Sequence, residues 1–284
     1  MKLIGLWALI QLLLIESGVQ SLLPYETDNC GYTVGDKIFG GSEAGLQQFP
    51  WIVMLIYYDT QREPFCGGTL INKRFVITAK HCEPKESPIK KVRLGEHNWH
   101  SNPDQQRVHN GVFIADKFQE VEVENSASID DEKEEILLLM LKRNVEPTAF
   151  IKPLCLPNPE MMNEDLINKR VIAIGWGYYN GQGRTSDAKQ WVSLTIKSAD
   201  ENKITTVYSE GRDTCTFDSG GPIMKIDPKS AHYVLVGVVW QGPQFCGHES
   251  KDDAVYANVV TKQTWIKNKM KELFNASHLK NVNS

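Results

Sequence analysis

The sequence predicts an all-β protein with antiparallel strands that ends in an α-helix. Short runs rich in β-branched and aromatic residues recur along the chain, separated by Gly, Pro, Asn and Asp, a pattern typical of antiparallel barrels or sandwiches. These runs are Trp51–Tyr58, Gly68–Ile71, Phe75–Thr78, Val92–Leu94, Ile136–Leu141, Arg170–Ile174, Gln190–Ile196, Pro222–Ile226 and Tyr233–Trp240. Over Thr261–Phe274 the apolar residues instead recur at helical spacing, which predicts an amphipathic helix followed by a polar tail over residues 275–284.

The N-terminal residues have the composition of a secretory signal peptide. Lys2 precedes an apolar run from Leu3 to Ile15, and small residues follow near position 21. The run is shorter than the roughly 20 residues that a membrane-spanning helix needs. We therefore expect residues 1–21 to be removed, the protein to be secreted and extracellular, and no membrane to be a partner. The alternative interpretation is a buried N-terminal helix.

A polar segment that is poor in core residues follows, and we interpret residues 22–37 as a leader. It ends at Lys37, and the chain continues as Ile38-Phe-Gly-Gly. A basic residue before such a start is a plausible processing site. The alternative is an ordinary exposed lysine in a loop.

Charge and motifs argue against several classes of partner and cofactor. The formal net charge of −4 disfavours a nucleic-acid partner. The glycines of Gly175–Gly177 and Gly181–Gly183 are interpreted as turn glycines, because no βαβ pattern surrounds them, and we expect no cofactor. Glu120, Glu122 and Glu124, with Asp116, fit either a calcium loop or an alternating acidic edge strand, and we expect no metal.

The six cysteines of an exported chain are candidates for disulfides rather than for metal ligation. Their spacing alone does not choose among the possible pairings.

Two motifs far apart in the sequence supply the groups for acyl transfer. His81 lies in the run Thr-Ala-Lys-His-Cys over Thr78–Cys82, and Ser219 lies in Asp-Ser-Gly-Gly-Pro over Asp218–Pro222. A serine hydroxyl is a poor nucleophile at neutral pH, so it needs a base to take its proton and N–H donors to hold the oxyanion. The pair indicates nucleophilic catalysis by serine.

With these motifs, residues 38 to about 274 resemble the chymotrypsin–trypsin family of serine endopeptidases. The resemblance implies two antiparallel six-stranded β-barrels with the site in the crevice between them. His81 then matches the general base and Ser219 the nucleophile. It also implies a protein or peptide substrate and an activating trypsin-like protease, with a protease inhibitor as a further candidate partner.

The same resemblance implies activation by cleavage and a pocket for basic side chains. Cutting after Lys37 would free the amine of Ile38 to pair with Asp218, which shapes the oxyanion loop and the pocket. Asp213 matches an acidic pocket floor that would attract Lys or Arg. Gly242 and Ala254 match positions in the pocket wall.

The disulfides implied by the resemblance are three. Cys66–Cys82 lies beside the histidine, Cys215–Cys246 beside the pocket, and Cys30–Cys155 ties the leader to the catalytic domain. With the last bridge, activation would cut the chain without releasing the leader.

The chain departs from the family pattern at the acid that orients the histidine. The family's aspartate aligns with Glu135, which is one methylene longer, about 1.5 Å of extra reach in a site where small displacements are costly. Asp130 and Asp131 are the alternatives, but they would break the match to the apolar run that follows. Lys80 could pair with Glu135 and draw it off His81. Alternatively, its stem covers apolar surface while its ammonium group reaches water.

Further departures affect the oxyanion loop and the pocket. The N–H groups of Phe217 and Ser219 match the oxyanion hole. Phe217 replaces a glycine there, and if strain turned its peptide away, one of the two donors would be lost. Trp240 replaces a serine that bonds the orienting acid, and Ala254 narrows the pocket by a methyl group. The stretch before Asp218 is shorter than in the family, and we expect Ser198–Gly211 to be a surface loop.

These observations lead to one function and one rival. We interpret the chain as a secreted trypsin-like serine endopeptidase made as a zymogen, which cleaves after basic residues with reduced activity. The alternative is a catalytically impaired homologue that acts as a binding or regulatory protein. His81, Ser219 and Asp213 favour the enzyme, whereas Phe217, Trp240 and Glu135 favour the rival.

Overall fold

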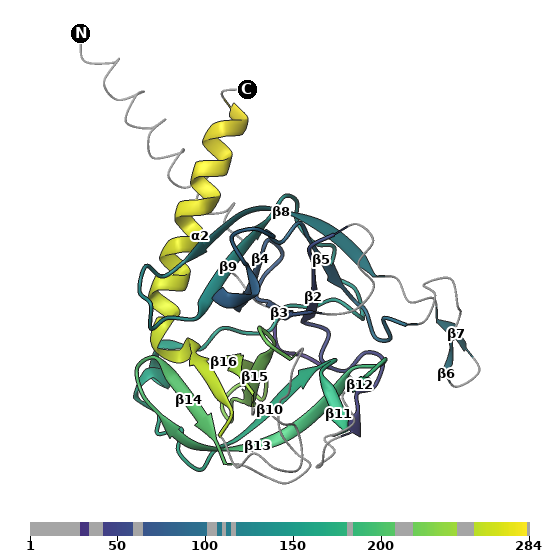
Figure 1. Cartoon of the computed structure of the whole chain (residues 1–284), viewed down its shortest axis with the longest axis vertical. Coiled ribbons are helices and arrows are strands. Elements are labelled where there is room, and N and C mark those ends of the chain that lie inside the picture. Colours follow the sequence, from purple (N-terminus) through teal and green to yellow (C-terminus); the bar gives the residue numbers. More distant parts are fainter. Residues whose placement is uncertain are drawn as a thin grey trace, which may run out of the picture.

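The structure is a computed structural model. It describes residues 29–33, 42–58, 65–100, 107–109, 112–114, 118–180, 184–207, 218–242 and 253–282. Two closed antiparallel barrels of six strands stand one above the other in Figure 1, and a C-terminal helix runs beside them. The predicted all-β fold with two six-stranded barrels and a C-terminal helix is confirmed.

The first barrel is built from the N-terminal half of the chain. Its strands are β2 (Ile52–Ile56), β3 (Gly67–Leu70), β4 (Phe75–Ala79), β5 (Lys91–Leu94), β8 (Gln119–Ser128) and β9 (Ile136–Leu141). They follow the order β2-β3-β4-β9-β8-β5, and pairing of β2 with β5 closes the ring. Every residue of β2 and β9 is buried, which is why both strands read as continuous apolar runs.

The second barrel closes in the same way. Its strands are β10 (Arg170–Gly175), β13 (Gln190–Ala199), β14 (Lys203–Thr206), β15 (Pro222–Ile226), β16 (Tyr233–Gln241) and β17 (Val255–Asn258). Pairing of β13 with β14 closes the ring, and the short strand β1 (Ser42–Glu43) adds to the outer side of β13. Two hairpins lie outside the barrels, β6 (Arg107–His109) with β7 (Val112–Ile114) and β11 (Tyr178–Asn180) with β12 (Arg184–Thr185).

The loop predicted over Ser198–Gly211 is wrong for the residues that the structure describes there. β13 continues to Ala199, and β14 follows after a tight turn. In that turn the Asp200 carboxylate accepts the N–H groups of Asn202 and Lys203 at 2.9 and 2.8 Å. The segment is polar because only alternate residues of β14 are buried, so a half-exposed strand was mistaken for a loop.

The C-terminal helix is longer than predicted. Helix α2 (Val259–Val282) takes up most of the expected polar tail. Asn258 caps its N-terminus, because the side-chain oxygen of Asn258 accepts the N–H of Val260 at 3.0 Å. Beyond the predicted end it is held by the buried Ser277, whose hydroxyl donates to Glu124 of β8.

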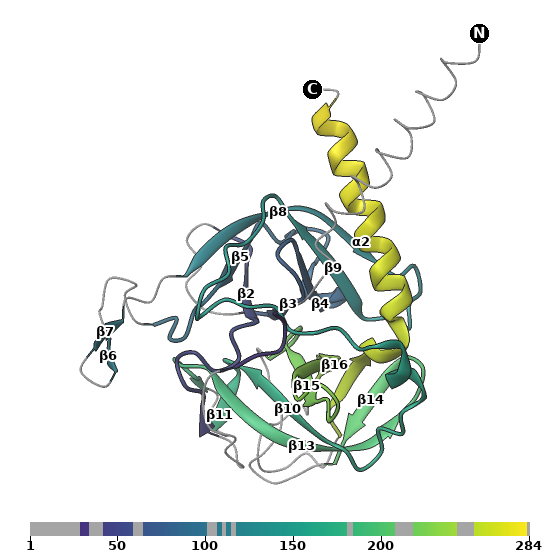
Figure 2. The same cartoon turned by 180° about the vertical axis from the view of Figure 1, so that it is seen from behind.

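Helix α2 contacts both barrels. It leaves the second barrel beside β16 and then passes along β9 of the first barrel, as Figure 2 shows from behind. Two short 3-10 helices complete the described elements, η1 (Lys80–Cys82) and η2 (Pro159–Asn163). In the part of the chain that the structure describes, no helix is both long and apolar enough to cross a bilayer.

The two barrels share part of one hydrophobic core. A cluster of buried side chains extends from Leu94 in the first barrel to Val238 in the second. At its centre the indole N–H of Trp51 donates to the sulfur of Met224 at 3.2 Å. Because a continuous core joins the barrels, the groups carried on their facing loops have a fixed relative position.

Candidate active site

His81 is held in η1, the single helical turn that follows β4. The disulfide between Cys66 and Cys82 ties this turn to the residue that precedes β3. The buried hydroxyl of Tyr57 donates to the carbonyl oxygen of Cys82 at 2.5 Å. Burial, with the charge of Glu83, raises the pKa of Tyr57 well above its ordinary value, so this donor stays protonated.

Glu135 reaches His81 from the start of β9. The pairing of Ala79 with Ile136 in the β4–β9 ladder brings the two segments together. Glu135 Oε2 lies 3.1 Å from His81 Nδ1 and accepts the backbone N–H of His81 at 3.2 Å. The Glu135 side chain is 15% exposed and that of His81 39%. The extra methylene therefore does not prevent the contact expected of an orienting acid.

The hypothesis that Lys80 draws Glu135 away from His81 is wrong. The ammonium group of Lys80 donates to the backbone carbonyl of Asp131 at 3.2 Å. Lys80 still acts on Glu135 at longer range through its charge, and its backbone N–H donates to the Glu135 carbonyl at 2.9 Å.

The environment of Glu135 favours its charged form. Burial on its own would raise the pKa of the carboxyl group. The hydrogen bonds from His81, with the charges of His81 and Lys80, outweigh burial and hold the pKa below its usual value of 4.5. A carboxylate that stays ionised can accept a hydrogen bond from Nδ1–H and so fix the imidazole tautomer.

Ser219 lies on a loop that is anchored to the first barrel. The carbonyl oxygen of Ser219 accepts the N–H of Gly67 at 2.8 Å. Gly220 has φ +80°, and a Cβ there would overlap the Thr78 hydroxyl and the Gly67 carbonyl. Gly67 follows Cys66, which is bonded to the residue after His81, so the serine and histidine segments meet at one contact between the barrels.

The structure records no direct hydrogen bond between the Ser219 hydroxyl and the His81 ring, both of which are described residues. Because Glu135 occupies Nδ1, Nε2 is the ring nitrogen left for the serine. Catalytic hydrogen bonds are often long in ligand-free sites and shorten when substrate binds.

Asp218 is packed against two glycines. Its Oδ1 accepts the N–H of Gly177 at 2.9 Å, and a Cβ on Gly175 or Gly177 would overlap the carboxylate. Neither glycine has positive φ, and Gly175 is the last residue of β10. They are glycines because the Asp218 side chain lies against their backbone.

The structure describes the wall of the predicted pocket but not its floor. Gly242 follows β16, and Ala254 is fully buried in the hydrophobic cluster of the second barrel. Trp240 is half-buried in an irregularity of the β16–β17 pairing between Val239 and Gln241. Six of the predicted site residues lie outside the described residues: Lys37, Ile38, Asp213, Cys215, Phe217 and Cys246.

The described part of the predicted leader is bonded to the second barrel's side of the molecule. Cys30 forms a disulfide with Cys155, the pairing that the resemblance implies, as Cys66 does with Cys82. Gly31 donates to the Pro153 carbonyl at 2.9 Å and accepts from the N–H of Tyr233 at 3.0 Å.

The acidic residues proposed for a calcium loop lie along β8, and each is paired with a cation. Glu120 pairs with Arg93 at 2.7 Å, Glu122 with Lys142 at 2.6 Å and Glu124 with Arg74 at 3.0 Å. The strand interpretation is correct, but β8 lies between β5 and β9 in a closed barrel, so it is not an edge strand. Asp116 is outside the described residues.

Several residues that build the site carry no local sequence signal. Tyr57 supports the histidine turn, and Gly67 holds the serine loop, through contacts with residues far along the chain.

Comparisons with known proteins agree with this geometry. The family model described as Trypsin matches residues 38–266. The chain is 31% identical to Spaetzle-processing enzyme of Drosophila melanogaster, over 86% of this chain and 68% of that protein. It is 31% identical to CLIP domain-containing serine protease B4 of Anopheles gambiae, over 89% of this chain and 75% of that protein. It is also 31% identical to phenoloxidase-activating factor 1 of Holotrichia diomphalia, over 86% and 72% respectively.

Proposed function

The chain belongs to the trypsin family of serine proteases, and from that premise we propose that it is a secreted endopeptidase made as a zymogen. In this proposal residues 1–21 are the signal peptide, residues 22–37 the leader and residues 38–274 the catalytic domain. The observation that carries it is the contact of Glu135 Oε2 with both Nδ1 and the backbone N–H of His81. That contact gives His81 the carboxylate partner that a catalytic base needs. It lies near the place where the Ser219 loop contacts the first barrel.

The catalytic roles follow from this arrangement. Ser219 Oγ attacks the scissile carbonyl while His81 Nε2 takes its proton, and Glu135 stabilises the imidazolium that forms. The N–H groups of Phe217 and Ser219 hold the oxyanion of the tetrahedral intermediate. When the intermediate collapses, His81 returns the proton to the leaving amine, and water then hydrolyses the acyl-enzyme by the same steps.

Activation is proposed to follow cleavage after Lys37. The new amine of Ile38 would join Asp218, whose carboxylate is already held by the N–H of Gly177 at 2.9 Å. The Cys30–Cys155 bridge supports a leader that stays attached to the cleaved enzyme.

Specificity for Lys or Arg is assigned to Asp213, with Gly242 and Ala254 in the pocket wall. We propose a protein substrate and an upstream trypsin-like protease that cuts after Lys37, with a protease inhibitor as a further partner. The names of two relatives, a spaetzle-processing enzyme and a phenoloxidase-activating factor, support a substrate that is itself a protein.

The rival function is a protease homologue that binds a partner without cleaving it. One observation favours it, the half-buried Trp240 at the position of the family's serine. Glu135 no longer counts for the rival, because its carboxylate reaches His81. Phe217 and Trp240 are therefore the residues to which we assign reduced activity.

One experiment separates the two functions. The purified protein is cleaved after Lys37, exposed to a fluorophosphonate probe and assayed with an arginine ester. The enzyme predicts labelling and turnover that both disappear in Ser219→Ala. A correctly cleaved protein that neither labels nor hydrolyses the ester would exclude the enzyme. A labelled protein that hydrolyses only esters of apolar residues would exclude the role of Asp213.

A further inference from the structure

Glu135 is carried by a short loop before β9, which we call the acid loop (residues 131–135). A turn opens the loop, because the carbonyl oxygen of Asp131 accepts the N–H of Glu134 at 3.2 Å. Glu135 is the last residue before the strand begins, so the path of the loop decides where its side chain starts. The position of the acid loop therefore sets how far the Glu135 carboxylate reaches toward His81.

The Glu135 carboxylate is held through one of its two oxygens. Oε2 accepts the backbone N–H of His81 at 3.2 Å and lies 3.1 Å from its Nδ1. No described residue donates a hydrogen bond to Oε1, and Trp240 stands at the position of the family's serine. A carboxylate held at one oxygen depends on its backbone for its position, and a displacement of about 1 Å in a catalytic site can cost about 100-fold in rate.

Lys80, the residue before His81, contacts the acid loop at both ends. Its ammonium group donates to the Asp131 carbonyl at 3.2 Å, and its backbone N–H donates to the Glu135 carbonyl at 2.9 Å. Because Lys80 and His81 are consecutive in η1, these bonds fix the loop relative to the turn that carries the base. Any residue with a backbone N–H can make the second bond, whereas the first needs a long side chain that ends in a donor. The ammonium contact is thus what the identity of this residue controls.

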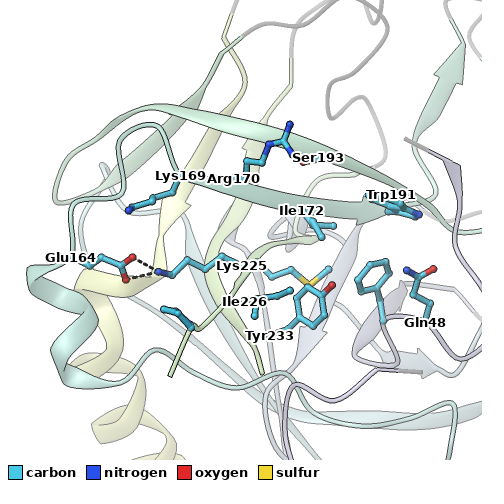
Figure 3. Close-up of a pocket in the computed structure, with 13 residues that line it drawn as sticks. Gln48, Glu164, Lys169, Arg170, Ile172, Trp191, Ser193, Lys225, Ile226 and Tyr233 are labelled. Atoms are coloured by element: carbon cyan, nitrogen blue, oxygen red, sulfur yellow. Dashed lines mark hydrogen bonds and ion pairs between the residues drawn. The ribbon is translucent and has the colours of Figure 1, made fainter. Parts of the chain in front are cut away.

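The ammonium group of Lys80 contacts no carboxylate in the part of the chain that the structure describes. Lys225 shows the opposite case. It lies in the wall of a cavity on the second barrel, and its ammonium group contacts both carboxylate oxygens of Glu164, as Figure 3 shows. Burial raises the pKa of Glu135, and the hydrogen bonds and charge of His81, followed by the charge of Lys80, lower it. Lys80 therefore favours the ionised acid as well as contacting its loop.

We propose that Lys80 is a positioning residue for the orienting acid. Its ammonium group holds the start of the acid loop at the place from which the longer side chain of Glu135 meets Nδ1 of His81. The role of orienting acid belongs to the proposed function, and this inference rests on it. The contact does not require turnover, so the position and ionisation of Glu135 are measurable in a protein that lacks the nucleophile.

NMR of the whole chain carrying Ser219→Ala tests the positioning without catalysis. In Lys80→Met the midpoint of the Glu135 carboxyl titration should rise, because a cation that favours the ionised form is lost. The low-field Nδ1–H signal of His81, which reports its hydrogen bond to the carboxylate, should broaden or move upfield. Lys80→Arg should restore both signals, because a guanidinium group also donates to a carbonyl. The matched control is Lys133→Met, which removes an exposed cation from the acid loop itself and should change neither signal.

Kinetics of the protein cleaved after Lys37 give a second readout. With an arginine ester we expect Lys80→Met to lower kcat about tenfold while KM changes less than about twofold, because the change acts on the base and not on substrate binding. In a Glu135→Asp background the same change should cost less than about twofold in kcat. The shorter acid does not reach His81 from this loop position, so there is no contact left for Lys80 to support.

Two outcomes would overturn the inference. A Glu135 midpoint and a His81 proton signal that are the same in Lys80→Met as in the parent would show that the ammonium contact does not position the acid. Equal changes in Lys133→Met would show that any cation of the loop has the same effect. If the cleaved parent neither labels nor hydrolyses the ester, the proposed function fails, and the NMR comparison alone then decides whether Lys80 holds Glu135 in place.

Discussion

The Asp218 carboxylate lies against the bare backbone of Gly175 and Gly177, and the N–H of Gly177 donates to it at 2.9 Å. In the proposed activation the Ile38 amine would therefore meet a carboxylate whose direction is set by its surroundings. Preorganisation of this kind lowers the cost of ordering the site when the amine arrives.

Gly177→Ala tests this packing. The added methyl group would lie about 2.5 Å from the carboxylate, so we expect the free energy of unfolding to fall by about 1–3 kcal/mol, the cost of overpacking. Gly45→Ala is the matched control, because its Cβ would meet no atom closer than 3.7 Å. Denaturant unfolding of both variants measures the difference, and equal stabilities would contradict the close packing of Asp218.

The Glu135–His81 contact predicts a dependence of stability on pH. A carboxyl group whose pKa is lowered in the folded state contributes stability that is fully present above its unfolded value of 4.5 and is lost as pH falls through the lowered value. We expect Glu135→Gln to be less stable than the parent by about 1–2 kcal/mol at pH 6. The difference should shrink below pH 4.5, as measured by urea unfolding across the pH range. A constant difference down to pH 3 would contradict the assignment.

The sequence could predict which residues form the charged part of the site, but not what holds them in place. Glu135 was found because the apolar run that it directly precedes matches the family's pattern, and in the structure that run pairs with the strand before His81. Gly67 and Tyr57 were not found, since they act on residues distant in the chain and no local pattern reports such a contact. The sequence also left the role of Lys80 undecided, because its ammonium group could either pair with Glu135 or reach water.

At the scale of the elements, helix α2 contacts the loop before β9, which carries Glu134 and Glu135. Lys262 in its first turn lies 2.5 Å from Glu134, the neighbour of Glu135, and both side chains are nearly buried, at 12% and 4% exposure. Lys262 also donates to Asn202 in the β13–β14 turn at 3.0 Å. One side chain thus joins the helix, the second barrel and the loop that carries Glu135, the proposed orienting acid.

Lys262→Met should destabilise the protein strongly. It would leave the Glu134 carboxylate buried without its cation, and loss of one member of a buried pair costs about 3–5 kcal/mol. The double variant with Glu134→Leu should recover most of that loss, because both charges are then removed. Lys271→Met, at an exposed position of the same helix, should change the free energy of unfolding by less than about 0.5 kcal/mol. If Lys262→Met lowered the free energy of unfolding no more than Lys271→Met does, the Lys262–Glu134 ion pair would not contribute to stability.

The limits of α2 and β14 show where element prediction fails. The sequence indicates the first turns of α2 by the spacing of their apolar residues. The last turns depend instead on the hydrogen bond from Ser277 to Glu124, which lies on β8, far away in the sequence. β14 is polar on one side, and its place in the barrel follows from pairing with β13 and β17 rather than from its own composition. The continuous apolar strand β9 was predicted to the residue, because burial on every side leaves a strong local pattern.

At the scale of the whole molecule, the hydrophobic cluster that crosses between the barrels makes independent unfolding of either barrel costly. Trp51 and Met224 come from opposite barrels and contact each other in that cluster. Helix α2 adds contacts to both barrels from outside. We therefore expect tryptophan fluorescence and far-ultraviolet circular dichroism to report one coincident unfolding transition, and two separated transitions would contradict a shared core.

The bridge from Cys30 to Cys155 spans 125 positions and turns the whole first barrel, with Lys37, into a covalent ring. A cut after Lys37 would open that ring, and the unfolded chain would regain the freedom that closure removed, worth up to about 5 kcal/mol. In an Asp218→Asn background, where no new ion pair can compensate, the cut form should unfold at a lower denaturant concentration than the intact form. Identical midpoints would contradict this topological effect. The event that would assemble the protease would thus also remove a topological constraint on the chain, and the ion pair formed with Asp218 would have to offset that loss.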